Sequence, residues 1–168
     1  GDTLTSIERV FGSDFEDSLT GTSGRDRLFG WGGNDVLKGG AGADSLDGGD
    51  GIDTADYQRS GSGVTVNLTT NRNRGGDAQG DKLTSIERVF GSDFDDSLTG
   101  SSGRDRLFGW AGNDQLFGME GDDILKGGEG NDEFIFGASF GRDTIVDFED
   151  GADKIVFEAD SGVTSMDD

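Results

Sequence analysis

The chain repeats a nine-residue unit ten times, in two blocks of five copies at residues 12–56 and 91–135. Every copy begins with Gly, has Asp at its sixth position and has an apolar residue at its eighth position. Gly also occupies the fourth position, except in the two copies that have Phe15 and Phe94 there. A period this short and regular indicates a stack of similar coils, because one unit cannot bury its apolar residue alone.

Each unit predicts a six-residue turn followed by a very short strand. Gly tolerates a left-handed backbone and leaves its carbonyl group accessible. Burying one Leu contributes about 1.5–3 kcal/mol, whereas ordering each residue costs roughly 1–2 kcal/mol in backbone entropy. The core is therefore thin, and we expect a bound ligand to stabilise the fold. The residues predicted to point inward are Leu19, Leu28, Leu37, Leu46, Ala55, Leu98, Leu107, Leu116, Leu125 and Phe134.

Acidic residues dominate the composition. The 168 residues include 35 Asp and Glu against 14 Lys and Arg, which gives a net charge of −21, and 30% of the residues are hydrophobic. Such a composition disfavours collapse. The sixth-position Asp residues, however, recur at a fixed period, so a bound cation would relieve their mutual repulsion.

Several functional classes are excluded by composition. The chain has no His and no Cys, so it lacks a Ser-His-Asp triad, the usual zinc ligands and disulfides. We therefore predict no catalytic residues, no organic cofactor and no enzymatic activity. The negative charge argues against nucleic acid as a partner. We expect no membrane insertion, since no apolar run approaches the roughly 20 residues that span a bilayer.

The oxygen-rich repeat favours calcium among the biological metals. Calcium takes six to eight oxygen ligands at about 2.3–2.6 Å, while magnesium requires a smaller and near-octahedral site. Zinc and copper prefer nitrogen and sulfur ligands. The alternative interpretation is that Gly and Asp mark only the turns of a solenoid, because both are common turn residues.

The template Gly-Gly-x-Gly-x-Asp-x-apolar-x resembles the repeat of the RTX calcium-binding family. This resemblance implies an all-β fold, a right-handed parallel β-roll (a β-solenoid), with two units or about 18 residues in each coil. It also implies a secreted bacterial protein, outside the cell or at the cell surface, that is exported by type I secretion and folds with calcium. We expect a monomer.

An internal duplication organises the chain. Residues 1–31 and 80–110 differ at only three positions, at an offset of 79 residues. Residues 57–90 lie between the blocks, and their 34 residues are close to two coils, so we expect connecting coils that continue one elongated roll over residues 1–168. A strand is predicted within this segment by the alternation of Val64, Val66 and Leu68.

The two ends differ from the repeats. In residues 1–11 the buryable positions are Leu4, Ile7, Val10 and Phe11, and we expect a turn followed by a strand. Residues 136–168 are predicted to form an aromatic C-terminal cap and a tail. The apolar run that begins at residue 133 resembles the segment that closes RTX arrays, and a repeat stack needs such a cap over its last coil.

The resemblance further implies about six Ca²⁺ ions, each held between two turns one coil apart by carbonyl groups and by two sixth-position Asp residues. In the first block the implied ligand sets are Ser13, Phe15 and Asp17 with Gly30, Gly32 and Asp35; Thr22, Gly24 and Asp26 with Gly39, Ala41 and Asp44; and Trp31, Gly33 and Asp35 with Gly48, Asp50 and Asp53. In the second block they are Ser92, Phe94 and Asp96 with Gly109, Ala111 and Asp114; Ser101, Gly103 and Asp105 with Gly118, Glu120 and Asp123; and Trp110, Gly112 and Asp114 with Gly127, Glu129 and Asp132.

Two departures from the family pattern bear on these sites. Phe at the fourth position predicts distorted, weak sites at the turns of Phe15 and Phe94. After Asp132 the sixth position falls on Gly141 instead of Asp. We hypothesise that the acidic residues beyond Gly141 form a separate metal site: Asp143, Asp147, Asp150 and Asp153.

Trp31 and Trp110 occupy the second position of their units, with pairs of Arg half a coil earlier. Trp beside Arg could bind an acidic sugar by stacking and ion pairing, or it could simply cover the coil edge. Three roles therefore stay open: a calcium-dependent folding module, an accessory module that binds an alginate-like acidic polysaccharide, and the non-catalytic C-terminal part of a secreted enzyme.

Overall fold

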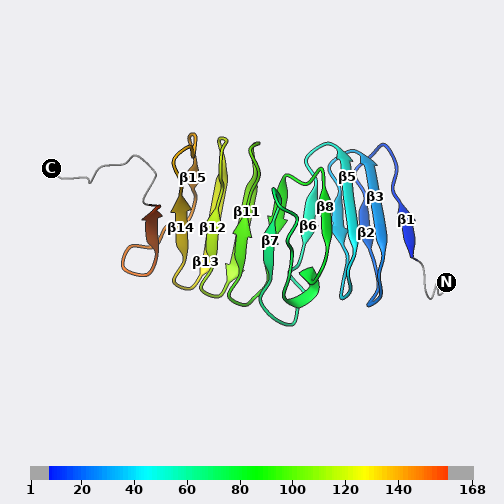
Figure 1. The fold of residues 1–168 in the computed structure, drawn as a ribbon, viewed down its shortest axis with the longest axis horizontal. Coiled ribbons are helices and arrows are strands. Elements are labelled where there is room, and N and C mark those ends of the chain that lie inside the picture. Colours follow the sequence, from blue (N-terminus) through cyan, green and yellow to red (C-terminus); the bar gives the residue numbers. More distant parts are fainter. Residues whose placement is uncertain (1–7, 159–168) are drawn as a thin grey trace.

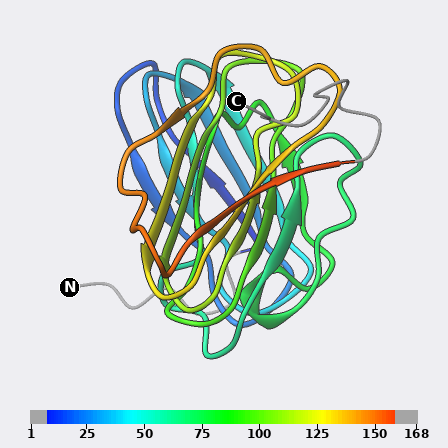
Figure 2. The same cartoon turned by 90° about the vertical axis from the view of Figure 1, so that its left-hand side faces the viewer.

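The computed structural model describes residues 8–158, which form a stack of parallel β-coils (Figure 1). Turned by 90°, the coils superimpose on one another (Figure 2). The first strands are β1 (Arg9–Phe11), β2 (Ser18–Thr20), β3 (Arg27–Gly32), β4 (Val36–Lys38), β5 (Ser45–Asp50), β6 (Thr54–Asp56), β7 (Thr65–Asn67) and β8 (Lys82–Thr84). The others are β9 (Arg88–Phe90), β10 (Ser97–Thr99), β11 (Arg106–Ala111), β12 (Gln115–Phe117), β13 (Ile124–Glu129), β14 (Glu133–Phe136), β15 (Thr144–Ile145) and β16 (Lys154–Phe157).

Successive strands alternate between two faces of the roll, except β7 and β8, which both belong to the same face. One face is a seven-stranded sheet with the order β15-β13-β11-β9-β6-β4-β2. The other face consists of a four-stranded sheet, β1-β3-β5-β8, and a five-stranded sheet, β16-β14-β12-β10-β7. Neighbouring strands within a block pair in parallel at an offset of 18 residues, as Leu28 does with Leu46. The all-β parallel roll expected from the sequence is confirmed.

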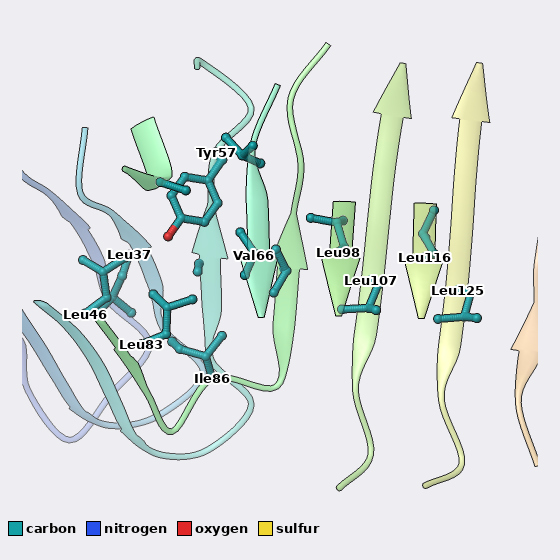
Figure 3. Close-up of a cluster of buried hydrophobic side chains, with 14 of the residues drawn as sticks. Leu37, Leu46, Tyr57, Val66, Leu83, Ile86, Leu98, Leu107, Leu116 and Leu125 are labelled. Carbon is teal, nitrogen blue, oxygen red and sulfur yellow. The ribbon is translucent and has the colours of Figure 1, made fainter. Parts of the chain in front are cut away.

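The eighth residues of the units form the core, as predicted. All ten are buried, and nine of these side chains are 0% exposed. In Figure 3, leucines of successive coils follow one another between the two layers of strands. The prediction that the first six residues of every unit form a turn is wrong for β3, β5, β11 and β13, which continue into the first three residues of the next unit.

The two blocks are half a coil out of phase. The connecting residues supply three strands, β7, β8 and β9, rather than the four that two full coils would supply. As a result β1 and its duplicate β9 lie in different sheets. The same shift places Trp31, on β3, in the four-stranded sheet and Trp110, on β11, in the seven-stranded sheet.

Two asparagine side chains bridge the gap between β7 and β8. Asn71 accepts a hydrogen bond from the Leu83 N–H (2.7 Å) and donates to the Leu83 carbonyl (2.8 Å), as a strand neighbour would. Asn73 accepts from the Asn67 N–H (2.8 Å) and donates to the Asp81 carbonyl (3.1 Å). The loop that carries them includes a short 3-10 turn, η1 (Gly76–Ala78). Side chains thus continue the face of the roll where no strand lies.

The C-terminal segment continues the stack with β14, β15 and β16 and carries the predicted aromatic cap. Phe136 packs against Phe140 and Phe157 with ring centroids 5.2 and 5.7 Å apart, and Phe134 lies 6.2 Å from Phe148. At the other end Val10 contacts the core, but Phe11 is 58% exposed, contrary to expectation. The positions predicted for Leu4, Ile7 and the tail beyond residue 158 lie outside the described residues. Within residues 8–158, none of the helical structure is long and apolar enough to cross a membrane.

Candidate metal sites

The sixth-position Asp residues form four ladders along the turns of the roll. In each step the backbone N–H of one Asp donates to Oδ1 of the Asp in the next coil, as from Asp17 to Asp35 (2.8 Å) and from Asp35 to Asp53 (2.7 Å). The ladders are Asp17–Asp35–Asp53, Asp26–Asp44–Asp81, Asp96–Asp114–Asp132–Asp153 and Asp105–Asp123–Asp143.

The second oxygen of most ladder residues is buried and has no hydrogen-bond partner. A buried acceptor without a partner is costly, and an ionised carboxylate costs still more. A cation at this oxygen would remove that cost. Among the described residues, Oδ2 is buried and without a partner in Asp35, Asp44, Asp53, Asp114, Asp123, Asp132 and Asp143.

Backbone carbonyl groups face the same spaces. A Cβ added to Gly109, at a first position, would touch Oδ2 of Asp114 and lie 2.6 Å from the Gly127 carbonyl oxygen of the next coil. A Cβ on Gly33, at a fourth position, would lie 2.8 Å from the Phe15 carbonyl oxygen of the preceding coil. The structure therefore brings first-position carbonyls, and at Gly42 also the fourth-position carbonyl of Gly24, close to the sixth-position carboxylates. Among residues 8–158 no group of three or more acidic side chains is arranged to hold a metal, so carbonyls would have to supply much of any site.

Burial raises the pKa of the ladder carboxyls. The pKa of Asp114 rises to about 8, first because of burial and then because of the charges of Asp96 and Asp132. Burial likewise raises the pKa of Asp123 to about 7 and that of Asp44 to about 6. At neutral pH Asp114 is therefore mostly protonated and Asp123 about half protonated, unless a cation replaces the proton.

The opening turns of each block differ from the later ones. In them the second-position N–H and hydroxyl both donate to a carboxylate oxygen of the turn's own Asp, as from Ser13 to Oδ2 of Asp17 (2.6 and 2.9 Å) and from Thr22 to Oδ2 of Asp26 (2.6 and 2.8 Å). Ser101 contacts Asp105 in the same way, and Ser92 donates to both oxygens of Asp96. Four of the six implied sites thus begin with an Asp whose Oδ2 is already hydrogen-bonded. The first Asp residues of the other two sites, Asp35 and Asp114, have a free Oδ2.

The fourth-position Phe residues do not distort their turns. The left-handed backbone of later turns, such as φ 114° at Gly33, is absent from both Phe15 and Gly24. Both opening turns lack the left-handed backbone, although one has Phe and the other has Gly at the fourth position. Phe is therefore not the cause of this difference from the later turns. The signal in the sequence is the Ser or Thr at the second position, which our sequence reasoning missed.

The C-terminal acidic residues extend two ladders instead of forming one separate site. The Asp123 N–H donates to Asp143 Oδ1 and the Asp132 N–H donates to Asp153 Oδ1, both at 3.0 Å, at offsets of 20 and 21 residues. Asp147 accepts from the Gly127 N–H at 3.1 Å. The separate-site hypothesis is therefore wrong, because longer final coils restore the sixth-position Asp to the ladder.

One ladder ends on a tyrosine. Asp81 accepts the Asp44 N–H on Oδ1 (2.8 Å) and the Tyr57 hydroxyl on Oδ2 (3.0 Å). Tyr57 is 2% exposed, and it lies against the core (Figure 3). The Tyr57 hydroxyl is therefore the hydrogen-bond partner of Asp81 Oδ2. Among the described residues, Oδ2 of Asp53 and Oδ2 of Asp143, which belong to the last Asp of two other ladders, have no such partner.

Tyr57→Phe should destabilise the roll even with saturating calcium. The change removes one hydrogen bond and leaves a buried carboxylate oxygen unpaired, which costs about 1–3 kcal/mol. Denaturant unfolding followed by circular dichroism would measure the loss, with calcium stoichiometry as the control. An unchanged free energy of unfolding would show that the Tyr57 hydroxyl does not stabilise the end of this ladder at Asp81.

Comparison with protein-family models identifies the nine-residue repeats. The model of the RTX calcium-binding nonapeptide repeat matches residues 11–46, 32–55, 90–125 and 111–145, which together span more than half of the chain. Among solved structures, the extracellular lipase LipA from Serratia marcescens is 28% identical with a TM-score of 0.39; the match covers 92% of this chain and 33% of the lipase, so the chain spans about a third of its length. A search of curated proteins finds no match. By its repeats, the chain belongs to the RTX calcium-binding nonapeptide repeat family.

Proposed function

We propose that this chain is a non-catalytic module of a secreted bacterial protein and that calcium binding drives its folding. The seven carboxylate oxygens that are buried and without partners within residues 8–158 carry the proposal. The six ligand sets implied by the repeat give the proposed number of ions, and any catalytic activity of the whole protein is placed outside this chain. Export by a type I system would suit a chain that stays unfolded until it meets extracellular calcium.

The energetics of the ladders support a dependence on calcium. Each coil buries few apolar side chains, and it stacks carboxylates whose charge is poorly compensated. Among the described residues only three ion pairs lie within 4.0 Å, and none involves a ladder Asp. Stabilisation by a ligand that binds the folded state grows with its concentration relative to Kd, so millimolar calcium could supply what the thin core does not.

A calcium titration of the EDTA-stripped protein, followed by far-UV circular dichroism, tests this proposal. We expect a cooperative change from coil to β structure with calcium and none with an equal concentration of magnesium. A β signal that is complete in EDTA would contradict the proposal. It would show that the apolar core and the side-chain hydrogen bonds of Asn71 and Asn73 hold the fold without metal.

A second candidate function, binding of an acidic polysaccharide, is favoured by one surface feature. A groove of about 440 Å³ is lined by Arg25, Arg27 and Lys82, together with Phe29 and the ladder residues Asp26 and Asp44. Three basic side chains together on a chain of net charge −21 suit an acidic sugar when calcium neutralises Asp26 and Asp44, with Phe29 as a stacking surface. Trp31 does not line this groove, and Trp110 lies in a different sheet, so the arginines carry this proposal rather than the tryptophans.

Alginate binding by the calcium-loaded protein tests the second candidate. Arg27→Ala combined with Lys82→Ala should abolish binding. Arg106→Ala is the matched control, because it changes the duplicate of Arg27 on the other sheet. Equal loss in the control would indicate nonspecific charge attraction, and no binding by the wild-type protein would rule out this function.

A further inference from the structure

We propose an additional cation site at the junction of the two blocks, between the turn of residues 48–53 and the short turn of residues 85–87. The site extends the proposed calcium binding to residues outside the nonapeptides. It would connect the last turn of the first block to the segment that begins the second. The argument starts from Asp53, whose side chain is 0% exposed.

Asp53 presents a buried oxygen to this junction. Its Oδ1 accepts the Asp35 N–H at 2.7 Å, whereas its Oδ2 has no partner. The space beside Gly48 shows where Oδ2 points. A Cβ placed on Gly48 would lie 2.5 Å from Asp53 Oδ2 and would also touch the carbonyl oxygen of Ser85.

Ser85 supplies the carbonyl that a nonapeptide would supply. Between nonapeptides, the carbonyl of Gly127 lies in the corresponding place beside Gly109, 2.6 Å from an added Cβ. The pairing of β5 with β8, which ends at Asp47 and Thr84, puts Ser85 next to Gly48. Ser85 has a left-handed backbone with φ 50°. The carbonyl is therefore in place although the segment is not a repeat.

Glu87 supplies the second carboxylate. The Asp53 N–H donates to its Oε2 at 3.0 Å, which makes Glu87 the next member of the ladder. The turn is three residues shorter than a nonapeptide turn, and Glu, with one methylene more than Asp, spans the difference. Within the described residues Oε1 of Glu87 has no hydrogen bond, so it is free to bind an ion.

The remaining oxygens and the local charge also suit a cation. Gly49 and Gly51 have left-handed φ angles of 100° and 147°. Trp31 and Gly33, the corresponding residues one coil earlier, are also left-handed, and their carbonyl oxygens face the following coil. The carbonyl groups of Gly49, Gly51 and Ser85 and one carboxylate oxygen each from Asp53 and Glu87 offer five protein oxygens. Water would complete the six to eight oxygens that calcium takes. None of the ion pairs among residues 8–158 involves either carboxylate, and the nearby Arg88 donates to Thr54 Oγ1 instead (3.4 Å).

The test compares Glu87→Gln with Glu8→Gln. Glu8 is the duplicate of Glu87 within the same local sequence, Thr-Ser-Ile-Glu-Arg-Val-Phe, but it is exposed and precedes the first nonapeptide. Equilibrium dialysis against calcium at saturation, with circular dichroism to verify folding, gives the number of ions for each chain. We expect one ion fewer for Glu87→Gln than for wild type, and no change for Glu8→Gln.

Other outcomes separate this site from the proposed function. An unchanged ion count in folded Glu87→Gln would overturn the junction site while leaving the other sites intact, whereas no binding by wild type would overturn calcium binding altogether. If Glu87→Gln does not fold, Glu87→Asp decides. Its shorter carboxylate should weaken one class of sites at least tenfold, and a binding isotherm identical to wild type would contradict the proposal.

Discussion

Gly33→Ala is expected to destabilise the calcium-loaded roll by about 3 kcal/mol or more. Gly33 has φ 114°, and a non-glycine residue in a disfavoured backbone region costs roughly 1–3 kcal/mol. The added Cβ would also lie 2.5 Å from the carbonyl carbon of Phe15 and 2.7 Å from the Glu16 nitrogen. These atoms are backbone, so adjacent coils would have to separate, and the space where the carbonyls converge would be lost.

Gly24→Ala is the matched control, at the same position of an opening turn. Gly24 lies outside the left-handed region, and its added Cβ would meet only Thr22 Oγ1, at 3.6 Å. Its unfolding free energy should stay within about 1 kcal/mol of wild type, with a small gain possible from reduced freedom of the unfolded chain. Denaturant unfolding at saturating calcium measures both variants. Equal destabilisation would show that the fourth-position Gly serves no different purpose in the two kinds of turn.

The nonapeptide period predicted the core, and the resemblance of the repeat to the RTX family implied the parallel roll. One apolar position in nine can be buried in only one way when coils repeat every 18 residues, and Leu19 to Phe134 accordingly point inward. These features follow from local sequence, because each coil repeats the environment of its neighbour.

The features that sequence reasoning missed depend on segments without the period. The half-coil shift between blocks arises in the loop where Asn71 and Asn73 replace a strand, and no pattern in that loop indicates it. In the final coils the ladder Asp residues are 20 and 21 positions apart, so counting in steps of nine residues reached Gly141 instead of Asp143. The Gly-x-Asp ending at Asp143 repeats the fourth to sixth positions of a nonapeptide and could have identified it.

Without calcium, the roll should become less stable as pH rises from about 4 to about 8. The pKa values of Asp44 and Asp81 are raised to about 6, that of Asp123 to about 7 and that of Asp114 to about 8, chiefly by burial, from 3.8. The folded state therefore holds protons that the unfolded state has released. Each such carboxyl lowers the unfolding free energy by about 1.4 kcal/mol per pH unit between its unfolded and folded pKa values.

The β signal of protein stripped on a chelating resin, measured by far-UV circular dichroism from pH 4 to pH 8, checks this sign, because it should be largest at the acidic end of this range. Calcium that binds to the folded roll must displace the same protons, so the calcium affinity of the folded state should decrease as pH falls below about 7. Asp114→Asn removes the carboxyl with a pKa of about 8. This variant should be more stable than wild type without calcium at pH 8, show a shallower pH dependence, and require more calcium for its remaining transition. Stability that instead rises with pH in the stripped wild type would show that the ladder carboxyls are ionised when the roll folds without metal.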